Sequence, residues 1–352
     1  MYIKAAAHKA AIAGAALLTV CACVLMMIFS DGCKKGVAEG LDFCLRVLVP
    51  SLFPFMALVG LTVKTGLCHR IGHKLGKPTR LLFGLDGAFA PIIILSLIGG
   101  YPVGARAIAQ LYKHGAVNAR QAKRAAMFAV CAGPGFLISF VGAGIYQNET
   151  VGIIILCSQI LSVIILGIIL NIFNKRDDFD PIHKASVSSV PFSAAIVESA
   201  RDAAGGMAGI CSLVLLFSAV TGICEELIPS ETANDFIISA LEICSAVGRL
   251  SKNYPIEVTA FAIGFGGICV HFQIFAALGD LKINKPLFFF YRIIQGAITA
   301  AITHIGIKLF LKETAVFSSG SVGSAGIFGG SALGGAALMT VAICFLLSLR
   351  KQ

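Results

Sequence analysis

An apolar run that contains its own helix breakers constrains this chain more than any other feature. Residues 95–112 read LSLIGGYPVGARAIAQLY, so a Gly-Gly pair and a proline fall in the middle of a membrane-length stretch. Backbone that leaves the helix at membrane depth is tolerated only where protein buries it or where it lines a watery cavity. Interrupted helices of this kind form the substrate sites of many secondary transporters. The run therefore predicts a binding or conduction site inside a membrane.

The composition also indicates a membrane protein. Hydrophobic residues make up 57% of the chain and charged residues 13%, whereas about a quarter of a soluble domain is charged. The stretches that reach the roughly 20 residues needed to cross a bilayer are 11–29, 41–63, 151–173, 203–223, 287–311 and 327–349, and the interrupted stretches are 81–112, 125–146 and 256–278. We expect an all-α, polytopic transmembrane bundle in the cell membrane. The first stretch is expected to stay as a helix, because no small-residue cleavage site of a signal peptide follows it.

The formal net charge of +10 lies in short loops between the apolar stretches. No basic and aromatic face accompanies it, so we expect no nucleic-acid partner and attribute the charge to the positive-inside rule. The loop 64–80 carries five cations and no acid, and a second basic loop follows at 113–124. Both ends of 81–112 are therefore predicted to be cytoplasmic. A broken segment with both ends on one side is a re-entrant hairpin.

The second half of the chain echoes the first. The Gly99-Gly100 break has a counterpart in the sequence GFGG at 264–267. Two halves of opposite orientation, each with a broken hairpin, form the inverted-repeat architecture of many secondary transporters. The predicted organisation is a transmembrane helix and loop at 1–40, a first repeat at 41–175 with hairpin 81–112, a second repeat at 176–312 with hairpin 256–280, and a Gly/Ser linker with a C-terminal helix at 313–352.

Several motifs carry a resemblance to a known family. The segments PSLFPFMALVG, GGYPVGARAIAQLY, RAAMFAVCAGPGFLISFVGAGIY, ALEICSAVG and GFGGICVHFQ follow in this order. Together they resemble the bacterial nucleoside-recognition (Gate) membrane family, and specifically its sporulation integral membrane protein branch. The resemblance runs from about Val49 to about His304, and its most specific pieces are GYPVGA, AGPGF and GGICVHFQ.

The resemblance implies a hairpin-and-helix fold related to concentrative nucleoside carriers. It also implies a link to spore maturation and to the movement of dipicolinate, a small planar dicarboxylate, across a forespore membrane. One departure stands out. Where the family usually has an Asn pair before Gly-Pro, this chain has Val130-Cys131 before Ala132-Gly133-Pro134. The substrate, or an ion coupled to it, is therefore open to question.

The first break has a chemistry that can be argued from its residues. A half-helix that begins after Gly100 points free N–H groups and about half a positive charge at the break, which suits a carboxylate or phosphate. Arg106 lies further along the same half-helix, beyond Pro102 and Gly104, and either pairs a substrate carboxylate in a two-pronged way or reaches the cytoplasmic interface. Tyr101 either stacks on a planar ring or caps the hairpin tip.

The second half offers further candidate binding residues. His271 and Gln273 follow Gly266-Gly267 in an apolar run, and an ionisable residue inside a membrane is costly enough to suggest function. The alternative for His271 is a core side chain that bonds a neighbouring carbonyl. Glu242 is predicted either to be a protonatable coupling group or to pair with Arg249 or Arg292. At the other break, Gly133-Pro134 either exposes carbonyls to the cavity or only kinks a helix.

Other kinds of function lack support. The 12 cysteines form no C-x-x-C pair and the chain has no phosphate-binding G-x-x-x-x-G-K-[ST] motif, so we expect no metal, no cofactor and no enzyme. Two functions remain. The first is a secondary transporter or facilitator of a small organic anion, dipicolinate or a similar carboxylate, coupled to protons or sodium, with a nucleoside as the other substrate class. The second is a non-transporting component of spore or envelope assembly. The sequence leaves direction of transport and homo-oligomer formation open.

Overall fold

A computed structural model describes residues 2–173 and 191–311 of this chain. These residues are predominantly helical and contain no strand. All of them belong to one compact unit. The predicted linker and C-terminal helix at 313–352, like the loop 174–190, lie outside the described residues.

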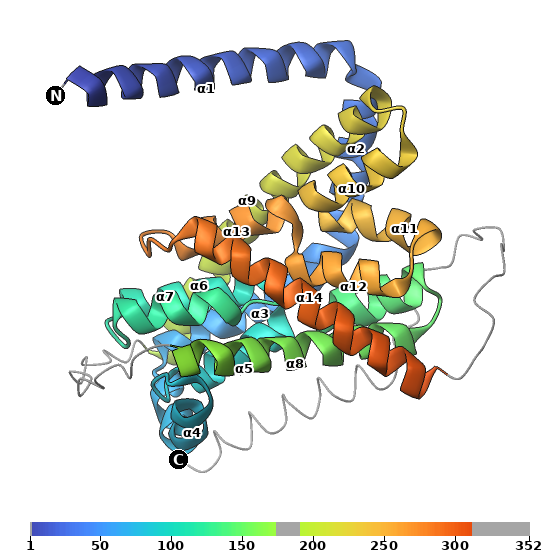
Figure 1. The fold of residues 1–352 in the computed structure, drawn as a ribbon. Helices are drawn as coiled ribbons and strands as arrows, with labels where there is room; N and C mark the ends of the chain where they lie inside the picture. The colour runs from blue at the N-terminus through green and yellow to red at the C-terminus, as the bar shows by residue number, and fades with distance from the viewer. Residues whose placement is uncertain (1, 174–190, 312–352) are drawn as a thin grey trace. The chain divides into compact units, whose positions relative to one another are not determined.

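The helices follow one another with several short interruptions (Figure 1). They are α1 (Tyr2–Ile28), α2 (Ser30–Phe43), the π-helix η1 (Cys44–Leu48), α3 (Val49–Lys64), α4 (Leu67–Phe83), α5 (Phe89–Gly99), α6 (Tyr101–Lys113), α7 (Ala119–Phe128), the π-helix η2 (Gly135–Ile145), α8 (Glu149–Phe173), α9 (Phe192–Leu227), α10 (Glu231–Leu241), α11 (Ile243–Asn253), α12 (Ile256–Phe265), α13 (Gly267–Leu278) and α14 (Lys285–Phe310).

Five segments of the described chain are long and apolar enough to cross a membrane. They are Ser30–Lys64, Glu149–Phe173, Phe192–Leu227, Ile256–Leu278 and Lys285–Phe310. Three of them contain the uninterrupted stretches predicted at 41–63, 151–173 and 203–223, and the last covers all but the final residue of the stretch predicted at 287–311. The all-α, polytopic prediction is thereby confirmed.

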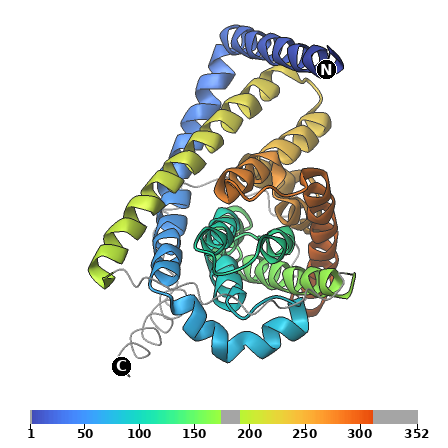
Figure 2. The same ribbon diagram turned by 90° about the vertical axis from the view of Figure 1, so that its left-hand side faces the viewer.

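Two long elements run side by side in one part of the molecule. The continuous helix formed by α2, η1 and α3 packs along α9, and Figure 2 shows the two next to each other. Small residues make this approach possible. An added Cβ on Gly36 would meet the Ser218 carbonyl oxygen at 2.0 Å, and one on Gly222 would meet the Gly32 carbonyl oxygen at 2.1 Å. Backbones that pack this closely are a common way to hold membrane helices together.

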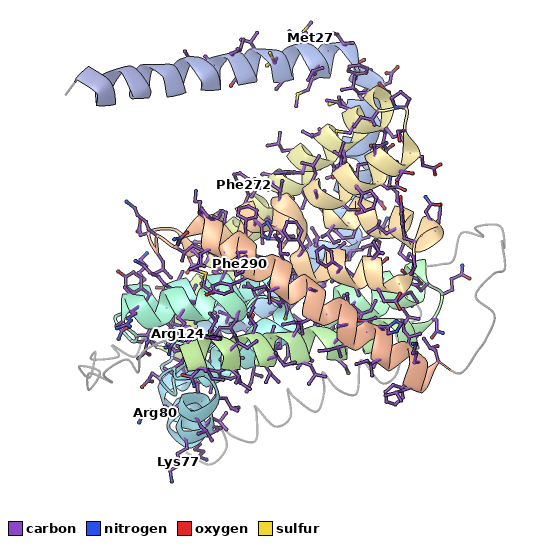
Figure 3. The ribbon with its side chains drawn as sticks, in the orientation of Figure 1. Met27, Lys77, Arg80, Arg124, Phe272 and Phe290 are labelled. Carbon is purple, nitrogen blue, oxygen red and sulfur yellow. The ribbon has the colours of Figure 1, made fainter. Side chains whose placement is uncertain are left out.

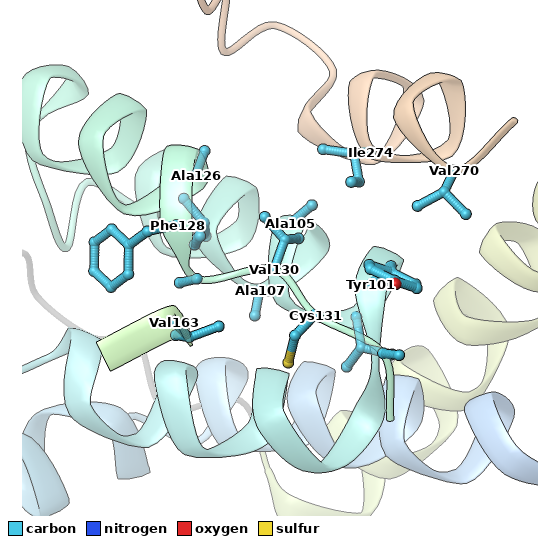
Figure 4. Packing of buried hydrophobic residues seen from close by; sticks show 14 of the residues in the cluster. Tyr101, Ala105, Ala107, Ala126, Phe128, Val130, Cys131, Val163, Val270 and Ile274 are labelled. Atoms are coloured by element: carbon cyan, nitrogen blue, oxygen red, sulfur yellow. The ribbon is translucent and has the colours of Figure 1, made fainter. Parts of the chain in front are cut away.

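The shorter helices form a second group around a shared apolar core. The core joins side chains from the hairpin α5–α6, from the segment after α7 and from α13, as Figure 4 shows for Ala105, Val130 and Val270. Helix α6 packs on α13, and α14 packs on both α8 and α12. The interrupted elements are therefore gathered in one place, around which the site described below is built.

Helix α4 is amphipathic and connects the two groups. It follows α3 and packs on α5, and its cations Lys77 and Arg80 are exposed on its outer side (Figure 3). Cys68 at its start is buried, and this burial raises the pKa of the thiol to about 12. A thiol that is both covered and protonated reacts poorly with labelling reagents.

One predicted element takes a different form. The segment 256–280 was expected to be a re-entrant hairpin, but α12 and α13 follow one another along a single membrane-length stretch, Ile256–Leu278, that is interrupted at Gly266. The helices that fold back on each other in the second half are α10 and α11. The first hairpin is as expected, since α5 and α6 pack together on either side of Gly100.

Candidate functional site

The chain leaves the helical conformation at four points inside its interrupted elements. Gly100 has φ 92° and ψ −176°, and Gly266 has φ 92°, a left-handed region that glycine occupies without strain. The residues between Ala129 and Pro134 separate α7 from η2, and Glu242 is extended between α10 and α11. The predicted breaks are confirmed, but they are short, because the chain is helical again from Tyr101.

Two of these breaks contact one another. The Tyr101 hydroxyl donates a hydrogen bond to the carbonyl oxygen of Ile263 in α12. A Cβ built on Gly266 would lie 3.6 Å from the Tyr101 ring. The first residue of α6 is therefore held against the last turn of α12.

A buried arginine joins the same breaks from α14. Arg292 is fully buried, and its guanidinium donates to the carbonyl oxygens of Val130, Gly264 and Phe265, to Val130 at 2.6 Å and to Phe265 at 3.2 Å. Gln295 accepts a hydrogen bond from Arg292 at 2.6 Å and donates to the Val130 carbonyl at 3.2 Å.

These partners explain how a buried charge is tolerated. Removing an ion from water costs several kcal/mol unless the protein replaces the lost interactions. The Val130 carbonyl lies just past the end of α7, and Gly264 and Phe265 form the last turn of α12. Each helix C-terminus carries about half a negative charge, so the two ends together balance one guanidinium. Arg292 also lies over the Tyr101 ring, with its Cζ 5.5 Å from the ring centroid.

A cavity opens on the other side of Tyr101. It holds about 570 Å³ of space between the side chains, a volume that includes the open solvent at its mouth. Its lining comes from both hairpin tips, from the α7–η2 break, from α13 and from the helix η1–α3. The lining residues used below are Ser51, Gly100, Tyr101, Pro102, Gly133, Gly135, Glu242, Cys244 and Gln273.

Three helices begin at this cavity. Helix α6 begins at Tyr101, η2 at Gly135 and α11 at Ile243, and all three first residues line the cavity. A helix N-terminus presents unbonded N–H groups and a partial positive charge, which makes it a ready anion-binding element. Three such ends border one space whose described lining holds no basic side chain, and one of them, that of α11, is capped by Glu242.

Glu242 is the acidic side chain of the cavity. It is 1% exposed, and its Oε2 accepts the N–H of Ser245 at 2.7 Å, which caps the first turn of α11. The Cys244 thiol contacts the same carboxyl group. Glu242 is not paired with Arg249 as one alternative proposed, because Arg249 binds Glu225 at 2.5 Å and Asp235 at 3.5 Å. The bonds that Arg292 makes to carbonyls leave it apart from Glu242 as well.

Half of the predicted binding residues line the cavity. Gly100, Tyr101, Pro102, Gly133, Glu242 and Gln273 line the cavity. Pro134 caps the N-terminus of η2 next to it. Gly104 lies inside α6, where a Cβ would meet Ser96 Oγ at 2.0 Å, so its role is close packing of the two hairpin arms.

The other predicted residues lie elsewhere. Arg106 donates to the Asp202 carbonyl of α9 at 2.5 Å and is not part of the cavity lining. His271 is buried in the core among the rings of Phe265, Phe288 and Phe289, each edge-on to it. Neither of its ring nitrogens has a hydrogen-bond partner among the described residues, so the carbonyl bond of its core alternative is not seen.

Gly266 and Gly267 form the break beside Arg292 and do not line the cavity. A Cβ on Gly266 would lie 3.6 Å from an Arg292 nitrogen, and one on Gly267 would lie 3.3 Å from the Leu241 carbonyl oxygen at the end of α10. Gly267 thus lets α13 begin close to the backbone at the end of α10, and Gly266 leaves room for the side chains of Arg292 and Tyr101.

Sequence reasoning missed the role of Arg292, although a signal was present. The residue falls within an apolar, membrane-length stretch, where an ionisable side chain marks a functional or structural centre by default. What the sequence did not reveal was the nature of its partners, since these are carbonyl groups of broken helices.

Comparison with known proteins gives a relative with a membrane role. The "Sporulation integral membrane protein YlbJ" of Bacillus subtilis (strain 168) is 20% identical to this chain over 302 residues, and the alignment covers 74% of each chain. No protein-family model matches the chain, and no solved structure gives a significant match. The five membrane-length helices and this similarity together show a multi-pass integral membrane protein.

Proposed function

We propose that this chain is a secondary transporter or facilitator that carries a small organic anion through a membrane. The observation that carries the proposal is the convergence of three helix N-termini, those of α6, η2 and α11, on one cavity. A scaffold protein that only assembles with partners has no need for several interrupted helices whose ends meet at one cavity. The cavity therefore favours transport over the assembly function.

We also propose that the interrupted elements form two inverted repeats. The hairpin α5–α6, the broken helix α7–η2 and α8 would correspond to the hairpin α10–α11, the broken helix α12–α13 and α14. Both sets run in the same order of hairpin, interrupted helix and full-length helix, which supports the pairing and resembles concentrative nucleoside carriers. In this pairing Gly100 corresponds to Glu242, and the α7–η2 break corresponds to Gly266.

The similarity to a sporulation integral membrane protein supports a role in a spore-forming bacterium, in a membrane of the developing spore. We propose dipicolinate or a comparable carboxylate as the substrate. A planar aromatic ring has faces to contact in Tyr101 and Phe136, which line the cavity, and its carboxylates suit the helix N-termini.

The proposal is tested with purified protein in vesicles. We expect labelled dipicolinate to accumulate when a proton or sodium gradient is imposed, and excess unlabelled dipicolinate to abolish the signal. A matched pair of variants links transport to the cavity. Gly133→Val places side-chain atoms against Gly100, whose backbone nitrogen would lie 3.2 Å from an added Cβ, and should abolish uptake. Gly209→Val, on the open side of α9 where an added Cβ has nothing within 4 Å, should not.

The outcome decides between the alternatives. Uptake of nucleosides but not of carboxylates would show that the substrate is a nucleoside and would support the transporter proposal. Absence of uptake and binding for both classes, in protein that is folded and correctly inserted, would leave the assembly function as the better explanation.

A further inference from the structure

We propose that each anion enters the cavity together with one proton, and that Glu242 takes up this proton. The inference rests on the proposed function and specifies its coupling ion. It follows from a count of the charges that surround the cavity, from the position of Glu242 among them, and from the cost of placing two negative charges in one small space.

The described residues that line the cavity include one carboxyl group, that of Glu242, and no Lys, Arg or His. Arg106 is engaged with α9 at the Asp202 carbonyl. Arg292 lies over the Tyr101 ring and donates to carbonyl oxygens of α7 and α12. An anion in the cavity therefore meets helix N-termini and an acidic side chain, without a basic side chain to pair with.

An ionised Glu242 would oppose the anion that the helix ends attract. Two unit negative charges about 5 Å apart, at the effective dielectric constant of about 20 that suits protein sites, lower affinity on the order of 100-fold. A proton on Glu242 removes this repulsion. It also converts the side chain into a hydrogen-bond donor, which a carboxylate ligand can accept.

Three thiols and a phenol face Glu242, and none of them is a second carboxyl group. Thiols of Cys44 in η1, Cys244 in α11 and Cys269 in α13 interact electrostatically with it, and the Tyr101 phenol of α6 lines the same cavity. Thiols and phenols ordinarily titrate well above carboxyl groups. Among the other charged groups of this hairpin, Arg249 binds Asp235 and Glu225.

The proposed coupling is a proton transfer to Glu242 and involves no covalent change in the ligand. A proton from the aqueous phase is added to the Glu242 carboxylate as the anion binds, and it is released when the anion leaves. The anion and the proton cross together, so a proton gradient drives transport and the charge moved per cycle is reduced by one. By linkage, an anion that binds together with a proton binds more weakly as the pH rises.

The test is calorimetric binding of dipicolinate to the full chain in lipid nanodiscs between about pH 6 and 9, where a carboxylic acid of ordinary pKa, such as the probe, is ionised. Each titration is repeated in two buffers of different ionisation enthalpy, which gives the number of protons taken up. For the wild type we expect proton uptake with each anion and a Kd that weakens as the pH rises, up to the roughly 100-fold that the charge repulsion allows.

Three variants sharpen the test. Glu242→Gln should bind with no proton uptake, with a flat pH profile, and at the alkaline end at least tenfold more tightly than the wild type. Glu242→Asp keeps a titratable group and should keep the proton uptake. Glu257→Gln is the matched control, because Glu257 is bonded to His304 at 2.6 Å away from the cavity, and it should retain the wild-type slope.

If the wild type binds the anion without proton uptake and with an affinity that does not change with pH, this inference is overturned, but the proposed transport function is not. A pH slope that persists unchanged in Glu242→Gln also overturns it, because the proton would then bind another group. Failure of the wild type to bind either dipicolinate or a nucleoside at any pH overturns the proposed function, and this inference with it.

Discussion

At the scale of single residues, the structure is organised by a cation whose partners are backbone groups. Arg292 donates hydrogen bonds to carbonyl oxygens at the ends of α7 and α12, and it lies over the Tyr101 ring. The sequence identifies such a residue as costly, but it cannot name its partners, because every residue carries a carbonyl and only the fold decides which ones are left unbonded. Glu242 could be identified from the sequence, because an acidic residue in an apolar stretch is conspicuous whatever its partners are.

Arg292→Lys should lower the free energy of unfolding by about 2–4 kcal/mol, because a lysine keeps the charge and loses the forked geometry that reaches several carbonyls at once. Thermal unfolding in detergent measures the effect. Arg201→Lys on the exposed side of α9 is the control and should stay within about 0.5 kcal/mol of the wild type. Equal stability of both variants would contradict the bonding described for Arg292.

At the scale of elements, the uninterrupted spans were predictable and the second hairpin was not. Length and hydropathy alone identify a membrane span, and Gly100 and Gly266 were visible as breakers. Whether the chain folds back at a break depends on what the two arms pack against. Helices α5 and α6 pack on each other, whereas α12 packs on α14 and α13 packs on α6. The α10–α11 hairpin turns at Glu242, an extended residue that gives no glycine or proline signal.

The packing of α2 on α9 should depend on single glycines. Gly222→Ala would press a methyl group onto the Gly32 carbonyl, 2.1 Å away, and because both atoms belong to helix backbones the helices must separate. Overpacking of this kind costs about 1–3 kcal/mol. Gly209→Ala, on the same helix with nothing within 4 Å of the added carbon, should be neutral or stabilising by up to about 1 kcal/mol. Equal melting temperatures for the two variants would refute the contact.

At the scale of the whole molecule, the charges predict how the chain lies across the membrane. Lys64 at the end of α3 binds Glu198 at 3.1 Å and Asp202 at 2.9 Å, so the first part of α9 lies on the same side as the basic helix α4. The positive-inside rule makes this side cytoplasmic. The opposite end of α9, with Glu225 and Glu226, is then extracytoplasmic.

Sidedness is checked by labelling single cysteines in a cysteine-free background. Cys68 is unsuitable, because burial protects it and raises the pKa of its thiol to about 12. We expect Lys77→Cys on exposed α4 to react with an impermeant maleimide only after the cells are opened, and Glu226→Cys to react in intact cells. The reverse pattern would invert the topology, and labelling of both from outside would exclude it.

Synthesis of the chain runs from its N-terminus, so α7 and α12 enter the bilayer before α14. An arginine inside an isolated membrane helix costs roughly 2.5–3.5 kcal/mol to insert. The carbonyls that receive Arg292 belong to those earlier segments, so protein that is already in the bilayer can solvate this cation as it arrives. Helix α14 thus brings the counter-charge of helix ends that are already in the bilayer, and a nascent chain halted before it would carry two helix ends without that counter-charge.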